Sequence, residues 1–252
     1  MVRIHQITLS RSQLDSVPDA ERRLLILIAH ADNELNVLAK LFHFSTRARS
    51  KTPILAQAEN AQALVLGRIL TGKICECWQL LESAFFGTAL SKTYVPRFGK
   101  EAVQALESIK RYFGRNNPIT AIRNQHAFHY ALDKIDAGYR ALVDGDPLEV
   151  YLSEANANTL YAFADTIAGR AMLETIKPGD HQGAFETLIA DTSKMVNLLN
   201  TVIGEIMVTC IQTHFGGDLY SLGAKEIEIE GASDSQEISI PYFIEIVAEH
   251  DA

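Results

Sequence analysis

The chain of 252 residues is long enough to bury one large hydrophobic core or two smaller ones. Its composition, 47% hydrophobic and 21% charged, is ordinary for a globular protein and excludes extended disorder over most of the length. The net charge of −8 is unevenly placed, because residues 1–132 hold 17 Lys and Arg against 10 Asp and Glu, whereas residues 133–252 hold 6 against 21.

Three features bear on the cellular location. The N-terminal stretch from Met1 to Gln6 has no long apolar core, so we expect no secretory signal. The longest strongly apolar run, from Leu24 to Ala29, is far shorter than the roughly 20 residues that span a bilayer. The three cysteines are too few for a disulfide framework and have poor zinc spacing. We therefore predict a cytoplasmic protein with no membrane partner, no cofactor and no bound metal.

The first half of the chain predicts mainly helix. Residues 2–10 alternate weakly and suggest a short strand or a loose arm. Ser16-Val17-Pro18-Asp19 reads as a helix start, and apolar residues then recur at three- and four-residue steps for about 25 residues. Thr52-Pro53 opens a second long helix, which Gly67 and Gly72 are expected to bend. A third helix is predicted over residues 99–113.

Pro118 is expected to start a fourth helix, which continues to about Leu142. Beyond it the sequence alternates between strand and helix patterns. Residues 148–152 and 159–163 are expected to pair as strands, and helices are predicted over residues 166–176 and 181–214. The acidic segments 226–230 and 237–240 alternate with isoleucine and predict an exposed hairpin.

These elements predict a mainly α fold, an up-and-down helical bundle of long helices with small β-hairpin additions. We expect one helical domain over residues 1–217 and an acidic β-hairpin appendage over residues 218–252. Seven basic residues lie between Lys92 and Arg123, against only Glu101 and Glu107. This basic surface could attract phosphate or RNA, or it could be a solvated helix face.

The segment Ile122 to Tyr130 carries the strongest chemical signal. It places an arginine, an amide, two histidines and a phenol within nine residues, as Arg123, Asn124, His126, His129 and Tyr130. On a continuous helix that advances about 100° per residue, most of these polar groups and Asp133 share one stripe, with His129 at its edge. A neutral histidine can take a proton near pH 7, and arginine can hold a phosphate with its planar fork.

The motif Arg-Asn-x-x-x-Phe-His-Tyr, which follows two isoleucines, resembles the HEPN superfamily, including uncharacterised bacterial members. That superfamily contains helical bundles, often homodimers, many of which are metal-independent ribonucleases of toxin or antiphage systems. The resemblance implies catalytic roles for Arg123, Asn124 and His129, with a site built across a dimer. His126, Tyr130 and Arg115 would then bind the substrate. It also implies RNA as a partner, and an antitoxin or regulatory protein as a second one.

Other readings of the same segment stay open. His126, His129 and Asp133 lie at successive helical turns and could ligate a metal, with a fourth ligand from His30, His43, His181 or His214. Arg123 beside such a site argues against a cation. The histidines could also be ordinary surface residues of a non-catalytic scaffold that binds a partner or a small ligand. The sequence leaves open whether the protein is an enzyme.

Overall fold

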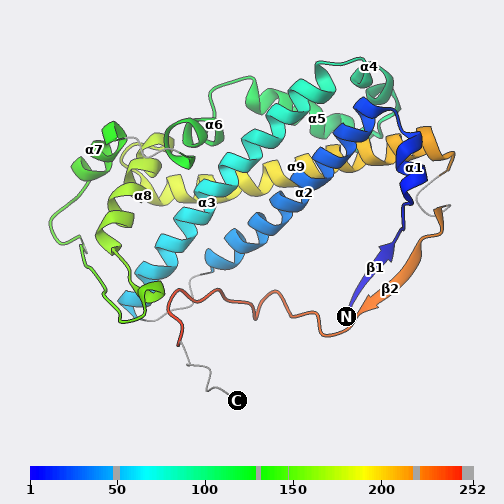
Figure 1. Cartoon of the computed structure of the whole chain (residues 1–252). Coiled ribbons are helices and arrows are strands. Elements are labelled where there is room, and N and C mark those ends of the chain that lie inside the picture. The colour runs from blue at the N-terminus through cyan, green and yellow to red at the C-terminus, as the bar shows by residue number, and fades with distance from the viewer. Residues whose placement is uncertain (48–51, 129–131, 147, 218–221, 246–252) are drawn as a thin grey trace. The chain divides into compact units, whose positions relative to one another are not determined.

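The computed structural model describes residues 1–47, 52–128, 132–146, 148–217 and 222–245 (Figure 1). Helices dominate the fold and two short strands complete it, which confirms the predicted mainly α class. The α-helices are α1 (Arg11–Ser16), α2 (Asp19–Ser45), α3 (Pro53–Leu81), α4 (Leu90–Tyr94), α5 (Lys100–Phe113), α6 (Pro118–Ile122), α7 (Leu132–Arg140), α8 (Ala162–Ile176) and α9 (His181–Phe215). Shorter π and 3-10 turns are η1 (Glu82–Phe86), η2 (Val95–Arg97), η3 (Arg123–Ala127) and η4 (Asn156–Asn158), and the strands are β1 (Val2–Gln6) and β2 (Lys225–Ile229).

The long helices begin and end where their sequence signals predict. Gly114 follows α5 and donates its backbone N–H to the carbonyl of Lys110. Gly216, with φ of +73°, follows α9 in a backbone conformation that glycine adopts without strain. The side chain of Asn117 accepts the backbone N–H of Thr120 at 2.8 Å and caps α6. These local signals explain why the predictions for α2, α3, α5 and α9 are confirmed.

The predicted continuous fourth helix is wrong. Helix α6 ends after five residues and passes into the π-helical turn η3. Phe128 then leaves helical geometry, with φ of −127° and ψ of 11°, before α7 begins at Leu132. A π turn has a wider hydrogen-bonded ring than an α turn, so an advance of 100° per residue no longer holds. The predicted polar stripe along one helix is therefore wrong as well.

The strand predictions need two corrections. Residues 148–152 and 159–163 do not form strands: they share an isolated bridge between Tyr151 and Leu160, and the backbone N–H of Phe163 donates to the carbonyl of Glu149. Strand β2 does not form a hairpin with residues 237–240, which are not a strand. It pairs antiparallel with β1, with Ile4 opposite Ile227, and Arg3 forms ion pairs with Glu226 and Glu228. Pairing with the basic β1 offsets the acidity of β2, whereas residues 237–240 offer no such complement.

The described chain divides into two compact units, which are treated separately below. Unit 1 comprises residues 1–37, 73–116 and 193–238. Unit 2 comprises residues 38–72 and 117–192 with the segment that starts at Ser239. Helices α2, α3 and α9 each contribute to both units. The predicted domain boundary at residue 217 stays a prediction.

The core of unit 1 is rich in aromatic side chains. Phe85 is fully buried, its ring stacks on Phe98, and it meets Tyr94 edge to face. Trp78 stacks on Phe113 with ring centroids 5.2 Å apart. Trp78 and Phe85 are both buried, and burial of rings of this size makes a large apolar contribution to stability.

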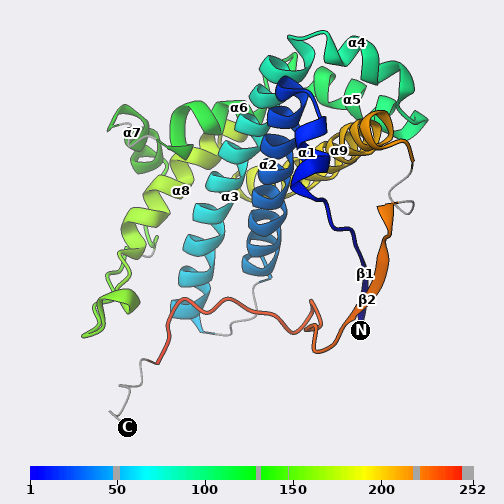
Figure 2. The same ribbon diagram turned by 45° about the vertical axis from the view of Figure 1, so that its right-hand side comes forward.

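Unit 2 is held by smaller side chains that let helices approach closely. Helices α7 and α8 lie side by side, as Figure 2 shows. A Cβ atom added to Gly138 of α7 would lie 2.0 Å from the carbonyl oxygen of Ile167 in α8. Tyr242 lies against a small cluster around Leu160 and donates its hydroxyl to the carbonyl of Thr159. The close approach at Gly138 sets the distance between α7 and α8.

Helix α9 is long and apolar enough to cross a membrane by length and composition alone. Half of its most apolar window is buried within the protein, as in the core helix of a globular fold. The finding is weak evidence for a membrane span, and the predicted cytoplasmic location stays a prediction.

Candidate functional site

Unit 2 contains a cavity of about 470 Å³ between α3, α7 and α8. Its walls are mostly apolar, and a few charged or polar side chains reach it from different helices. A concave, mainly apolar space with few polar groups is the usual form of a small-molecule site. The lining residues are Leu64, Val65, Arg68, Gln125, His126, Leu132, Lys134, Ile135, Ala164, Asp165, Ala168, Gly169 and Met172.

Arg68 is the most unusual group in this cavity. It lies within the apolar run Leu64 to Leu70 of α3, so its guanidinium is carried on a helix face that otherwise packs in the core. Its Nε atom is buried and has no hydrogen-bond partner, and within the part of the chain that the structure describes the side chain makes no ion pair. Leaving a buried charged donor without an acceptor costs free energy. The cavity therefore holds an unsatisfied cationic donor.

His126 enters the cavity from the π turn η3 and is 9% exposed. Its Nε2 lies 3.0 Å from the hydroxyl of Thr175, which itself donates to the carbonyl of Ala171. With the single Thr175 proton given to Ala171, the contact is completed by the tautomer that carries its hydrogen on Nε2. Burial, and then the charges of Arg68 and Lys134, lower the pKa of His126 to about 4. The imidazole is therefore neutral at pH 7.

Two further charged groups complete the cavity. Lys134 lies 2.9 Å from the exposed carboxylate of Asp133, so its charge is partly balanced outside the cavity. Burial raises the pKa of Asp165, and the nearby guanidinium of Arg68 partly opposes this shift. Desolvation thus outweighs the attraction, which is expected of a carboxyl without a direct ion pair. No ion pair joins Asp165 to Arg68 among the described residues.

Glycine sets the shape of the cavity wall. A Cβ atom on Gly169 of α8 would lie 2.5 Å from Cδ1 of Leu64, which also lines the cavity. Gly138 allows α7 to approach α8, and α7 carries Lys134 and Ile135 into the lining. Larger residues at either glycine would displace a wall of the cavity.

The predicted catalytic residues are only partly brought together. Arg123 and Asn124 lie next to each other on η3, where Nη1 of Arg123 donates to the side-chain oxygen of Asn124 at 3.2 Å. Neither lines the cavity. Of the predicted substrate-binding residues, His126 lies in the cavity, whereas Arg115 is exposed after α5 and belongs to unit 1. His129 and Tyr130 lie outside the residues that the structure describes.

The metal site proposed from His126, His129 and Asp133 gains no support. His126 is buried and bonded to Thr175, whereas Asp133 is exposed and paired with Lys134. Because the helix is interrupted between them, the regular spacing on which the reading depends is lost. His129, the third residue of this set, lies outside the residues that the structure describes.

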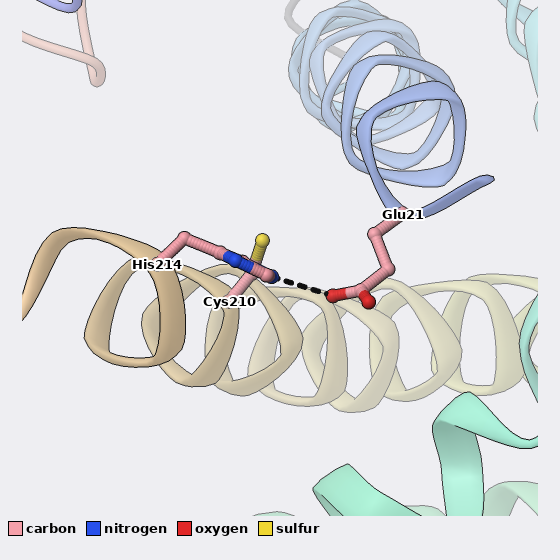
Figure 3. Close-up of side chains that lie close together, drawn as sticks. All are labelled: Glu21, Cys210 and His214. Atoms are coloured by element: carbon pink, nitrogen blue, oxygen red, sulfur yellow. Dashed lines mark hydrogen bonds and ion pairs between the residues drawn. The ribbon is translucent and has the colours of Figure 1, made fainter. Parts of the chain in front are cut away.

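Unit 1 holds a second polar cluster, at the start of α2 and the end of α9 (Figure 3). Ligating atoms of Glu21, Cys210 and His214 all lie within 4.8 Å of one another. Nε2 of His214 lies 2.7 Å from Oε2 of Glu21, and the hydroxyl of Tyr94 donates to the same carboxylate oxygen. Burial, followed by the bond to Glu21, raises the pKa of Tyr94 far above its usual range. Tyr94 therefore stays a donor at any ordinary pH.

Most residues of the two sites are missing from the sequence-based prediction, which named His214 only as a possible fourth ligand of another metal site. Arg68 had a signal, because it is a single charge inside an apolar run of a long helix. Cys210 and His214 had one as well, since a spacing of four residues puts them on the same helix face. Glu21 and Tyr94 carry no such signal, because only the folded chain brings them to α9.

Comparison with protein-family models, with curated proteins and with solved structures finds no match to this chain.

Proposed function

We propose that unit 2 binds a small ligand with an apolar body and one anionic group, in the cavity between α3, α7 and α8. The observation that carries this proposal is the guanidinium of Arg68, whose buried Nε has no acceptor beside a cavity of about 470 Å³. An anionic ligand would supply that acceptor and offset the cost of burying the charge.

The remaining lining fits the same ligand class. Neutral His126 can accept a hydrogen bond but adds no charge, so the cationic side chains are Arg68 and Lys134. The aliphatic wall from Leu64, Ile135 and Met172 suits an apolar body. The volume lies within the range of small-molecule sites, roughly 300–1,000 Å³. A carboxylate, sulfonate or phosphate head on a compact apolar group matches both parts.

Two fluorescent probes test this proposal. Anilinonaphthalene sulfonate has an apolar ring system and one anionic group, and N-phenylnaphthylamine has a similar ring system without the sulfonate. The full-length protein should bind the sulfonate probe at a saturable site. Arg68→Met, which keeps the length and apolar stem of the side chain, should weaken that binding by about tenfold or more, since a charge-assisted hydrogen bond contributes about 1.5–3 kcal/mol. Binding of the neutral probe should change little.

The matched control is Arg140→Met, which removes an exposed arginine of α7 in the same unit that does not line the cavity. It should bind both probes as the wild type does. Cooperative thermal unfolding of each variant would exclude binding of the probe to a loosened core. Equal affinity of wild type and Arg68→Met for the sulfonate probe would contradict the proposal.

A second candidate function is metal-independent RNA cleavage, as the resemblance to HEPN proteins implies. It is favoured by the position of Arg123 and Asn124 on a π-helical turn, because such turns occur frequently at functional sites. In this proposal Arg123 stabilises charge on the phosphate and His129 transfers a proton. Purified wild type should cleave RNA with and without EDTA, and His129→Ala should not. Cleavage by neither folded protein would favour the ligand-binding function.

Three proposals accompany that second function and stay predictions. They are RNA binding, a homodimer that completes the site, and an antitoxin or regulatory partner. RNA binding should weaken as salt is raised, because contacts to phosphates release counterions. A ligand-binding scaffold would show no such dependence.

A further inference from the structure

The polar cluster at the start of α2 and the end of α9 has the donor set of a metal centre. Cys210 offers a thiol sulfur, His214 an imidazole nitrogen and Glu21 a carboxylate (Figure 3). Sulfur, nitrogen and oxygen donors together suit Zn²⁺, a borderline metal that accepts all three. Hard cations such as Mg²⁺ and Ca²⁺ prefer oxygen alone.

The helices place these donors without strain. Cys210 and His214 lie four residues apart on α9, so both side chains leave the same face of the helix. Glu21 lies in the first turn of α2 and points at this face. Its oxygen is 2.7 Å from Nε2 of His214, whereas ligands of a tetrahedral zinc ion at about 2.1 Å lie about 3.3 Å apart. For this pair a shift of a few tenths of an ångström would replace the hydrogen bond by coordination, and the sulfur of Cys210 lies within 4.8 Å of both atoms.

Two further features lie beside the three donors. A void of about 10 Å³ is bounded by Glu21, Tyr94 and Cys210 but not by His214. That is about the space of one water-sized sphere. The rest of its wall is apolar, and the Tyr94 hydroxyl donates to Glu21 and is also hydrogen-bonded to Cys210, so it orients two of the three donors. The apolar wall is made by Leu24, Leu25, Leu90 and Ile206.

We propose that Glu21, Cys210 and His214 form a Zn²⁺ site that joins the start of α2 to the end of α9. Tyr94 orients the carboxylate of Glu21, and a water molecule takes the fourth position. Coordination displaces the thiol proton to solvent, so zinc is held by a thiolate. Glu21 and His214 remain partly exposed, with side chains 17% and 16% accessible, which leaves the ion a path from solvent. The role of such an ion is structural, because it links two helices of unit 1.

Cobalt substitution of the full chain tests the proposal. Metal-free protein titrated with Co²⁺ should develop the thiolate-to-cobalt charge-transfer band and the intense visible bands of a tetrahedral site, with one ion per chain. Added Zn²⁺ should abolish these bands. Cys210→Ser should lose the charge-transfer band, and Glu21→Gln should weaken Co²⁺ binding by about tenfold or more.

The matched control is Cys77→Ser, which replaces another buried thiol of unit 1 outside the cluster. It should keep the bands, and Zn²⁺ should raise the thermal midpoint of this variant and of the wild type but not of Cys210→Ser. Circular dichroism of the metal-free variants checks that each is folded. Absence of the bands in wild type, or their equal loss in Cys77→Ser and Cys210→Ser, would overturn the proposal.

Discussion

The two units bury charged groups in opposite ways. In unit 1 the carboxylate of Glu21 accepts hydrogen bonds from Tyr94 and His214, and the adjoining void is only about 10 Å³. In unit 2 the guanidinium of Arg68 borders a cavity of about 470 Å³ and its buried Nε has no acceptor. The half-buried carboxylate of Glu21 is therefore satisfied by its own chain, whereas the buried Nε–H of the half-buried Arg68 is not.

Glu21 links two helices through its hydrogen bonds, whereas Arg68 has a buried donor that the proposed ligand would satisfy. A carboxylate shared by a phenol and an imidazole is satisfied without a ligand, and in the proposed zinc site the ion would add Cys210 as a further link between α2 and α9. An unsatisfied guanidinium costs stability in the free protein, and that cost is recovered when an anion binds. The comparison predicts that changes in unit 1 alter mainly stability, whereas changes in the cavity of unit 2 alter mainly binding.

The largest effect is expected from a substitution that displaces one wall of the cavity. Gly138→Ala puts a methyl group 2.0 Å from the carbonyl oxygen of Ile167, a backbone atom that cannot move aside cheaply. We expect a loss of about 3 kcal/mol or more in the free energy of unfolding, measured in urea, because overpacking must push α7 away from α8. Binding of the sulfonate probe should fall in parallel.

Its control is Gly204→Ala on the exposed face of α9, where an added Cβ meets nothing within 4 Å. This change should stabilise the protein by about 0.5–1 kcal/mol, because alanine favours helix over glycine. A Gly138→Ala protein as stable as the wild type would contradict the close packing of α7 on α8.

The next effect concerns pH and the neutral imidazole of His126. An unfolded histidine has a pKa of about 6.5, and the folded value is about 4. Between these values the unfolded chain binds a proton that the folded protein does not, so stability is full above about pH 6.5 and is lost as the pH falls towards 4. Relative to His126→Gln, the wild type should lose on the order of 3 kcal/mol over this range.

Urea unfolding of both proteins at several pH values between 7 and 4 measures this difference. The other titrating groups are the same in wild type and His126→Gln, so their effects cancel in the difference between the two proteins. A stability difference that does not depend on pH would show that the imidazole is not held neutral in the cavity.

A smaller effect is expected in the closed cluster of unit 1. Tyr94→Phe removes the hydroxyl that donates to Glu21 but keeps the ring that packs against Phe85. The loss should be about 1–3 kcal/mol in the free energy of unfolding, the usual cost of a buried hydrogen bond to a charged group. Substitution of the exposed Tyr139 by Phe should change the free energy of unfolding by less than about 0.5 kcal/mol. Equal effects of Tyr94→Phe and Tyr139→Phe would show that the hydrogen bond from Tyr94 to Glu21 does not stabilise the fold.

The smallest effect tests whether the cavity prefers anionic ligands. Asp165→Asn removes the one carboxylate from the lining and leaves Arg68 and Lys134 in place. The sulfonate probe should then bind about three- to fivefold more tightly, since a repulsion on the order of 1 kcal/mol is removed. Titration of the probe by fluorescence measures this change, and weaker binding would contradict the anionic preference of the cavity.

The limits of sequence reasoning appear at Phe128. The long helices follow from apolar spacing and end residues, which are local properties of the chain. The break after η3 is not local, because the ring of Phe128 lies where a Cβ on Gly72 of α3 would be, only 2.4 Å from Cε2. This contact with a residue more than 50 positions away accompanies the departure from helical geometry. The sequence signal at Pro118 could therefore predict the start of α6 but not its end.

The candidate sites show the same limit. His126 lines the cavity, but its neighbours there come mainly from α3, α7 and α8, and its predicted role in binding a substrate stays a prediction. Arg68 and Asp165 are 97 positions apart and carry no shared motif. Only the packing of three helices brings them to one cavity, so neither residue pattern nor spacing could join them.

The pairing of β1 with β2 has a consequence for the growing chain on the ribosome. Gln6 pairs with Lys225, so the partner of β1 is synthesised about 220 residues after β1 itself. At roughly 5–20 residues per second, β1 leaves the exit tunnel some 10 to 40 seconds before β2 exists. The helices around it can form in that interval, since their contacts are local. β1 therefore stays without its partner strand while the intervening helices form, and a chain that stalls before β2 is made would expose β1 as an open edge to chaperones.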